Sequence, residues 1–266
     1  MKQIDWTSEN QVFVGRENNA LHWRLISCLK PEYRRIRLAY DLELVRPELS
    51  EKLQALLKPE DSTKQFATPE SMMPHIRKTV AGEYDFPTMP HFERPTILDL
   101  GANIGAFALW AKRRFPGNTL ICYEPHPENV KILNHNLKTF GILASVVEAA
   151  VSLQEGPVKL YSGKNNCGEA SLTQGIEQTE QFHEVATASP AELPPADIVK
   201  MDTEGAEWEI VQAYRHWEGV QAVMMEFHSA EDRTRIKEFL LSHGFDLGKE
   251  DMNHPDRGVM CFYRTI

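Results

Sequence analysis

From residue 96 onward, short apolar segments that are typical of β-strands alternate with segments of helical periodicity. The strands that this pattern predicts are Thr96–Leu100, Thr119–Tyr123, Ser145–Val151, Ile198–Met201 and Val220–Phe227. The predicted helices are Ala106–Phe115, Glu128–Phe140, Glu207–Tyr214 and Ala230–His243, and a strand pair, Phe245–Leu247 and Val259–Tyr263, follows them. Alternating strands and helices predict an α/β fold in which a largely parallel sheet is covered on both faces.

The first part of the chain does not follow this pattern. Residues 1–80 contain short segments of helical periodicity, such as Asn19–Leu29 and Pro47–Lys58, which prolines interrupt repeatedly. We therefore predict a helical N-terminal extension over residues 1–80 and a main domain over residues 81–266. The extension is expected to pack on the main domain, and a substrate lid or a dimer contact is the alternative role.

Charge restricts the partners that the chain can bind. Of its 266 residues, 29 are lysine or arginine and 38 are aspartate or glutamate, and the whole net charge of −9 falls after residue 95. A nucleic-acid-binding surface needs clustered positive charge, so we expect no nucleic-acid partner. We expect a small-molecule substrate instead, and a homodimer is possible.

The sequence also indicates a compartment. No apolar run approaches the ~18 residues of a membrane-spanning helix, and the N-terminus lacks the apolar segment of a secretory signal. The four cysteines are far apart and form no CxxC pair, which is typical of a reducing environment and argues against a zinc site or disulfides. We therefore predict a cytoplasmic protein without a membrane partner.

The stretch from Ile97 to Phe107 indicates a ligand site. It is predicted as a strand, a glycine turn and a helix, in which Gly101 permits a sharp turn and Gly105 permits a ligand to approach the start of the helix. The spacing is G-x-x-x-G, and Asn103 stands where a dinucleotide-binding turn has the glycine that admits a pyrophosphate. The turn therefore predicts a ligand without phosphates here. The alternative is a tight turn that binds nothing.

Glu124 adds a nucleoside signal. It ends the second predicted strand, 23 residues after Gly101, where an acidic side chain can accept hydrogen bonds from both ribose hydroxyls. A nucleoside without a pyrophosphate favours S-adenosylmethionine (SAM) over NAD as the cofactor. A structural role remains open, because a negative charge also stabilises the start of the following helix.

Several motifs together resemble the FkbM-type SAM-dependent methyltransferases. They are Gly82–Asp85, Leu98–Gly105, Glu124–Asn129 with Asn136, Ala150–Ser152 before Gly156, and Ile198–Glu207. The last contains the run Lys-Met-Asp-Thr-Glu-Gly-Ala-Glu, which generic SAM-binding proteins do not share. The resemblance covers about residues 82–245. It implies a class I, Rossmann-like methyltransferase sheet that is mostly parallel with an antiparallel terminal strand, and mostly O-methylation of sugar or polyketide hydroxyls.

The resemblance also implies a set of cofactor-binding residues. They are Glu83, Tyr84, Gly101, Ala102, Asn103, Gly105, Glu124, Pro125, Glu148, Ala149 and Asp202. In this set the glycine turn would line the methionine and ribose side of SAM, and Glu124 would bind the ribose. Glu148 and Ala149 would hold the adenine edge, although Glu148 departs from the Asp or Asn often found there. Glu83 and Tyr84 would fold over the amino acid end.

Ionisable residues follow two predicted strands at the carboxyl end of the sheet, where ligands bind in such folds. Asp202 and Glu204 follow one strand, and Glu226 and His228 end the next. Because side chains alternate along a strand, Glu226 and His228 lie on the same side. An unperturbed histidine titrates near neutrality, so we predict His228 as the base for an acceptor hydroxyl, with Asp202 and Glu226 completing the catalytic set.

Alternatives remain for these residues. His228 can cap the helix that begins near Ala230, and the glutamates Glu204 and Glu207 can stabilise a helix N-terminus. A divalent metal held by Asp202, Glu204, Glu226 or His228 is a further alternative, because carboxylates suit Mg²⁺. No tight ligand spacing demands it, so a metal is not favoured and the predicted site lists none.

The sequence predicts a SAM-dependent methyltransferase that methylates a hydroxyl of a small polar metabolite or of a sugar-containing natural product. One alternative is a non-catalytic binding subunit with a SAM-binding fold. The other is an NAD(P)-dependent oxidoreductase, which Asn103 and the absence of a Tyr-x-x-x-Lys pair disfavour.

Overall fold

A computed structural model of the chain describes residues 65–68, 72–163, 172 and 178–264. The described residues belong to one compact unit that begins at Gln65. The predicted N-terminal extension lies outside the described residues up to residue 64. Its last part, helix α4 (Met73–Val80), belongs to the compact unit, because Ile76 is buried in the same core cluster as Phe107. The unit therefore begins before the domain start predicted at residue 81.

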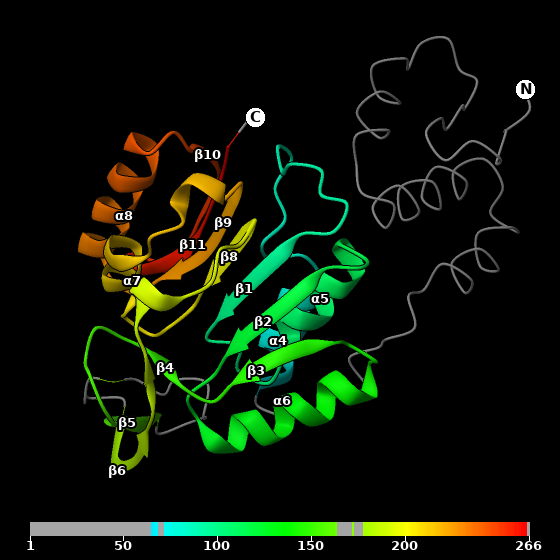
Figure 1. The fold of residues 1–266 in the computed structure, drawn as a ribbon, viewed down its shortest axis with the longest axis vertical. Helices are drawn as coiled ribbons and strands as arrows, with labels where there is room; N and C mark the ends of the chain where they lie inside the picture. The colour runs from blue at the N-terminus through cyan, green and yellow to red at the C-terminus, as the bar shows by residue number, and fades with distance from the viewer. Residues whose placement is uncertain (1–64, 69–71, 164–171, 173–177, 265–266) are drawn as a thin grey trace, which may run out of the picture. The chain divides into compact units, whose positions relative to one another are not determined.

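The centre of this unit is a seven-stranded sheet with the strand order β10-β11-β9-β8-β1-β2-β3 (Figure 1). The strands are β1 (Thr96–Leu100), β2 (Thr119–Tyr123), β3 (Ala144–Val147), β8 (Ile198–Met201), β9 (Ala222–Phe227), β10 (Asp246–His254) and β11 (Arg257–Tyr263). β1 pairs in parallel with β2 on one side and with β8 on the other. β2 pairs in parallel with β3, and β8 pairs in parallel with β9. β11 runs antiparallel to both β9 and β10. The predicted mostly parallel sheet with an antiparallel terminal strand is confirmed.

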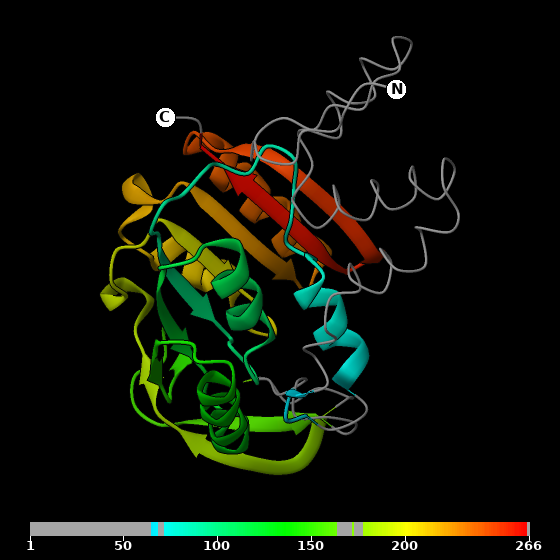
Figure 2. The ribbon, with the colours of Figure 1, turned by 90° about the vertical axis from the view of Figure 1, so that its right-hand side faces the viewer.

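Helices cover both faces of the sheet (Figures 1 and 2). One face carries α4, α5 (Ala106–Arg114) and α6 (Pro127–Thr139), and the other carries α7 (Glu207–Ala213) and α8 (Ala230–Ser242). Side chains of β1 alternate between the two cores, so that Ile97 packs in the cluster of α5 and α6, whereas Leu98 packs in the cluster of α7 and α8. Burial on both faces explains why the parallel strands β1, β8 and β9 are mostly apolar; Asp99 and Lys200 are the buried charged residues of β1 and β8.

Local signals explain where the longer helices begin. The His126 side chain accepts a hydrogen bond from the Glu128 backbone N–H, and Pro127 occupies the first position of α6. Ser229 accepts from the Asp232 backbone N–H at the start of α8.

In the described ranges, none of the helices combines the length and the apolar character that a membrane span requires.

The third predicted strand is wrong in one respect. Instead of one strand over Ser145–Val151, the chain leaves the main sheet after β3 and bends at Ala149, whose N–H donates to the Val147 carbonyl. Four short strands then form two small sheets: β4 (Ala150–Val151) pairs with β7 (Thr187–Ala188), and β5 (Val158–Gly163) pairs with β6 (Gln178–Val185). The 3₁₀ helices η5 (Pro190–Glu192) and η6 (Trp217–Gly219) flank β8 and α7.

Candidate active site

The turn between β1 and α5 lies against the end of β8. Gly101 has a φ of 77°, and a Cβ atom there would lie 1.8 Å from the carbonyl oxygen of Asp202. Gly105 has a φ of 94°, and its Cβ atom would lie 2.9 Å from Leu133 Cδ1. Both positions therefore require glycine. At Gly105 the close approach is made by α6 of the protein itself.

Asn103, between the two glycines, links the turn to the end of β2. Its backbone adopts a left-handed conformation with a φ of 49°, which asparagine tolerates better than most residues. Its backbone N–H donates to Glu124 Oε2 over 2.7 Å. Its side-chain Oδ1 is buried and has no hydrogen-bond partner among the described residues. A buried amide oxygen without a partner is costly, so this atom is available to a ligand donor.

Glu124 is almost fully buried, and its carboxylate braces the turn. In addition to the hydrogen bond from Asn103 to Oε2, Glu124 Oε1 accepts from the His126 backbone N–H over 2.9 Å and from Asn129 Nδ2 over 3.2 Å. Burial raises the pKa of Glu124, and these three hydrogen bonds oppose the rise. An ionised carboxylate has about four acceptor positions, so one remains for a ligand hydroxyl.

Two cavities meet at the glycine turn. The first, of about 60 Å³, is lined by Tyr123–Pro125, Ala149–Val151 and Thr203, among other residues. The second, of about 320 Å³, is lined by residues of α4, by Glu83 and Tyr84, and by Glu226 and His228. Gly101, Asn103, Asp202 and Glu204 line both cavities. A ligand can therefore extend from the first cavity past the turn into the second.

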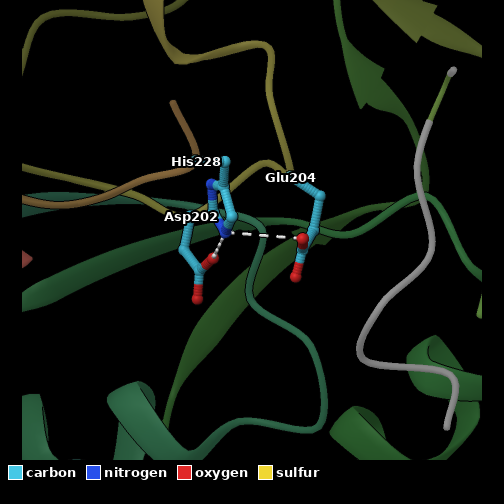
Figure 3. A group of neighbouring side chains, drawn as sticks. All are labelled: Asp202, Glu204 and His228. Carbon is cyan, nitrogen blue, oxygen red and sulfur yellow. Dashed lines mark ion pairs between the residues drawn. The ribbon is translucent and has the colours of Figure 1, made fainter. Parts of the chain in front are cut away.

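The ionisable residues at the ends of β8 and β9 come together beside this turn (Figure 3). His228 Nε2 lies 3.4 Å from Glu204 Oε2 and 3.9 Å from Asp202 Oδ1. Glu226 lines the larger cavity. Among the described residues, none makes a hydrogen bond or an ion pair with its carboxylate. Three of the predicted polar residues are thus adjacent, and Glu226 faces the same space.

Glu207 contacts the other ring nitrogen of His228, Nδ1. Its side chain is fully buried at the start of α7, where it accepts hydrogen bonds from the Thr203 N–H and hydroxyl and from the Gly205 N–H. Its Oε1 lies 3.2 Å from His228 Nδ1. Sequence reasoning treated Glu207 as a helix N-terminal charge and missed this contact, because no local pattern connects α7 with the end of β9.

Lys200 is a second residue that the sequence interpretation missed. It is buried in β8, where its Nζ lies 3.1 Å from Asp99 Oδ1 and donates to the Gly101 carbonyl over 2.6 Å. Burial lowers the pKa of Lys200, but the charges of Asp99 and Asp202 outweigh it and raise the pKa overall. The available signal was a lysine inside an otherwise apolar strand, since a buried charge requires a partner.

The charges around His228 change its predicted chemistry. Burial opposes the imidazolium, but the hydrogen bond to Glu207 and the charges of Glu207, Glu204 and Asp202 outweigh it and raise the pKa of His228 to about 10. Burial raises the pKa of Glu204 to about 8 and, together with the Asp202 charge, that of Glu226 to about 7. At neutral pH these carboxylates therefore keep His228 protonated, whereas the sequence predicts a neutral base.

Most of the predicted cofactor residues line the cavities, and two do not. The smaller cavity is lined by Gly101, Asn103, Glu124, Pro125, Ala149 and Asp202. The larger cavity adds Glu83, Tyr84 and Ala102. Gly105 packs against α6 instead. Glu148 is exposed and lines neither cavity, because β3 ends at Val147 and the chain turns inward only at Ala149. The structure therefore does not bring Glu148 to either cavity, and its adenine role stays a prediction.

This sheet order, with a glycine turn after β1 and an acidic residue at the end of β2, is that of the class I SAM-dependent methyltransferases. The chain matches the family described as "Methyltransferase FkbM domain" over residues 99–247. It belongs to this family and is a SAM-dependent methyltransferase of the FkbM type. Membership contradicts the oxidoreductase alternative.

Similar proteins agree with this assignment. Over 206 residues the chain is 27% identical to "Methyltransferase sdnD" of Sordaria araneosa, a match that covers 63% of this chain and 79% of that protein. It is 23% identical over 211 residues to "Methyltransferase 1" of Beauveria bassiana (strain ARSEF 2860), covering 68% and 85%. The crystal structure of Methyltransferase FkbM from Methylobacillus flagellatus KT superposes with a TM-score of 0.50 at 16% identity, covering 87% of this chain and 59% of that chain. At this identity the superposition shows the fold alone.

Proposed function

We propose that the protein methylates a hydroxyl oxygen of a small polar metabolite or of a sugar-containing natural product. The observation that carries the proposal is the meeting of two cavities at Gly101, Asn103, Asp202 and Glu204. The smaller cavity contains the residues suited to a nucleoside, and the larger one is lined by carboxylates. A cofactor and an acceptor in these cavities would meet beside the ends of β8 and β9.

The residues of the smaller cavity fit SAM. The unpartnered Oδ1 of Asn103 can accept from a ribose hydroxyl or an amino group, and the remaining acceptor position of Glu124 can take a ribose hydroxyl. Apolar Ala149 and Val151 line the same cavity and suit the faces of an adenine. Bound SAM supplies an electrophilic methyl group, and methyl transfer leaves S-adenosylhomocysteine.

The larger cavity suits a hydroxyl acceptor, because an unactivated hydroxyl needs a proton acceptor whereas a neutral amine does not. Glu226 is half-buried and lacks a protein partner among the described residues, so we assign it to accept the proton that the hydroxyl releases. Asp202 and the protonated His228 flank the same space and orient the acceptor. In-line displacement then depends mainly on this alignment.

The direct experiment incubates the full chain with SAM labelled with ¹³C in its methyl group and a panel of hydroxylated metabolites and glycosides. A product with the label in an O–CH₃ group supports the proposal. A label on nitrogen or carbon contradicts O-methylation. SAM binding in calorimetry without transfer to any of the panel would favour the non-catalytic binding subunit.

Substituting the proposed proton acceptor should impair turnover selectively. With an acceptor identified, Glu226→Gln is expected to lower kcat by roughly 10²-fold or more, the usual contribution of a general base, while SAM affinity stays unchanged. Glu231→Gln is the control, because Glu231 is exposed on α8 and pairs with Arg235 outside the cavities. Equal kcat values for the two variants would remove Glu226 from the mechanism.

Glu124→Gln tests the cofactor site independently of any acceptor. The glutamine NH₂ group is a donor, and it would face N–H donors that now bond to the carboxylate. The glycine turn would therefore lose a stabilising hydrogen bond, and the ligand would lose an acceptor. We expect SAM affinity to fall at least about tenfold, which calorimetry measures. Glu128→Gln is the control, since the side chain of Glu128 is exposed and pairs with Lys131 at the surface. Equal affinities in both variants would contradict a ribose role for Glu124.

A further inference from the structure

The arrangement of Asp202, Glu204 and His228 goes beyond what methyl transfer requires of them. Each offers one ligand atom, and the three atoms lie within 4.8 Å of one another (Figure 3). The His228 side chain is only 10% exposed, and its Nε2 points between the two carboxylates at distances beyond those of an ordinary hydrogen bond. The two oxygens of Asp202 face different groups: Oδ1 faces His228, and Oδ2 lies 3.9 Å from Lys200 Nζ.

Glu207 supplies a second, independent observation. Metal-binding histidines commonly donate their other ring nitrogen to a carboxylate, which fixes the orientation of the ring. Glu207 is placed in this way on His228 Nδ1, and it is held in turn by the N–H groups of Thr203 and Gly205. The buried pair therefore directs Nε2 toward Asp202 and Glu204.

We propose that Asp202 Oδ1, Glu204 Oε2 and His228 Nε2 together bind one divalent cation of the Mn²⁺ or Mg²⁺ class. Two ligands at about 2.1 Å from a common ion are roughly 3.0–3.5 Å apart. His228 Nε2 is already 3.4 Å and 3.9 Å from the two carboxylate oxygens, and all three atoms lie within 4.8 Å of one another, so side-chain movements of about 1 Å complete the set. Carboxylate oxygens suit these ions, and the imidazole favours Mn²⁺ among them. The ion takes the place of the Nε2 proton and offsets the surrounding negative charge.

The ion has a direct use in the proposed reaction. Its three ligands all line the larger cavity, so an ion held by them would border the space assigned to the acceptor. A hydroxyl oxygen bound there is positioned and made more acidic by the ion, and Glu226 lies on the same side to take its proton. This use depends on the proposed function, whereas binding of the ion itself does not.

The experiment measures Mn²⁺ binding to the full chain after treatment with a chelator, in the absence of SAM and acceptor. We expect calorimetry and electron paramagnetic resonance to show one Mn²⁺ per chain. Asp202→Asn, Glu204→Gln and His228→Asn should each weaken binding at least about tenfold. Glu231→Gln is the control, because Glu231 is exposed on α8 and pairs with Arg235 away from the cavities, and it should leave Mn²⁺ affinity within about threefold.

Glu207→Gln tests the orientation of His228 as a positioning effect. It should weaken Mn²⁺ binding roughly 10- to 100-fold while SAM affinity is unchanged.

If the variants of the buried Glu207 or His228 fail to fold, the Mn²⁺ affinities of Asp202→Asn and Glu204→Gln decide the proposal, because both side chains are partly exposed. No Mn²⁺ binding tighter than roughly millimolar, or equal affinity in these two variants and the control, would overturn the proposal. Mn²⁺ binding without methyl transfer would instead contradict only the proposed function.

Discussion

Replacement of Gly101 by alanine is expected to destabilise the protein by about 3 kcal/mol or more and to abolish SAM binding. The added Cβ atom would lie 1.8 Å from the Asp202 carbonyl oxygen. The Cβ atom is fixed by the backbone of Gly101 and the oxygen belongs to the backbone of Asp202, so β1 and β8 must separate at their carboxyl ends. The positive φ adds about 1–2 kcal/mol of strain. In thermal unfolding the Tm should fall by roughly 10 °C, and calorimetry should detect no SAM binding.

Gly156 provides the matched control. Its φ of 80° is close to that of Gly101, but a Cβ atom there would have no other atom within 4 Å. Gly156→Ala therefore carries the backbone strain without the collision, and we expect a loss of about 1–2 kcal/mol with normal SAM affinity. An equal loss of Tm and of SAM binding in the two variants would show that the contact with Asp202 is not the cause.

Substituting Lys200 by methionine should destabilise the protein by about 3–5 kcal/mol, because it leaves the buried Asp99 carboxylate without its cation. The substitution also removes the donor to the Gly101 carbonyl, which connects β8 with the glycine turn. We therefore expect a large loss of Tm together with weaker SAM binding. Thermal unfolding and calorimetry on the same preparation measure the two effects.

A double variant separates the buried charge from the loss of the lysine side chain. In Asp99→Asn with Lys200→Met, no fully buried charge is left without its partner, because Asp202, the other carboxylate near Lys200, is partly exposed. Stability should therefore recover by at least about half of the loss. Lys131→Met is the surface control, because both partners of the Lys131–Glu128 pair are largely exposed, and it should leave the Tm unchanged. A double variant no more stable than Lys200→Met alone would show that the ion pair is not what the lysine contributes.

Local patterns were sufficient to predict most of the fold. The bounds of β1, β2 and β8 agree with the predicted strands residue by residue, because each is a short apolar run between turn residues. The third strand was predicted too long, since the apolar run continues through Ala150 and Val151 although the chain changes sheets. An apolar run indicates burial but not which sheet provides it: Ala150 and Val151 are buried in the second sheet, whereas β3 itself is only partly buried.

The composition of the site was predicted less completely than its location. Residues at the ends of β1, β2, β8 and β9 were expected at one edge of a parallel sheet, and there the cavities lie. The protonation state of His228 was predicted differently, because a single histidine in a sequence carries no information about three carboxylates around it. Glu148 was assigned by its place in the chain, and a bend of one residue turned it to solvent.

The order of strands and helices, the glycine turn and the methyltransferase class followed from the sequence by itself, because periodicity, turn chemistry and motif spacing are properties of neighbouring residues. Only the tertiary structure decided which charges share an environment. Lys200 meets the Gly101 carbonyl across 99 positions of the chain, and Glu207 meets His228 across the gap between two strand ends. Such contacts depend on strand order and register, and the pKa of each group follows from them.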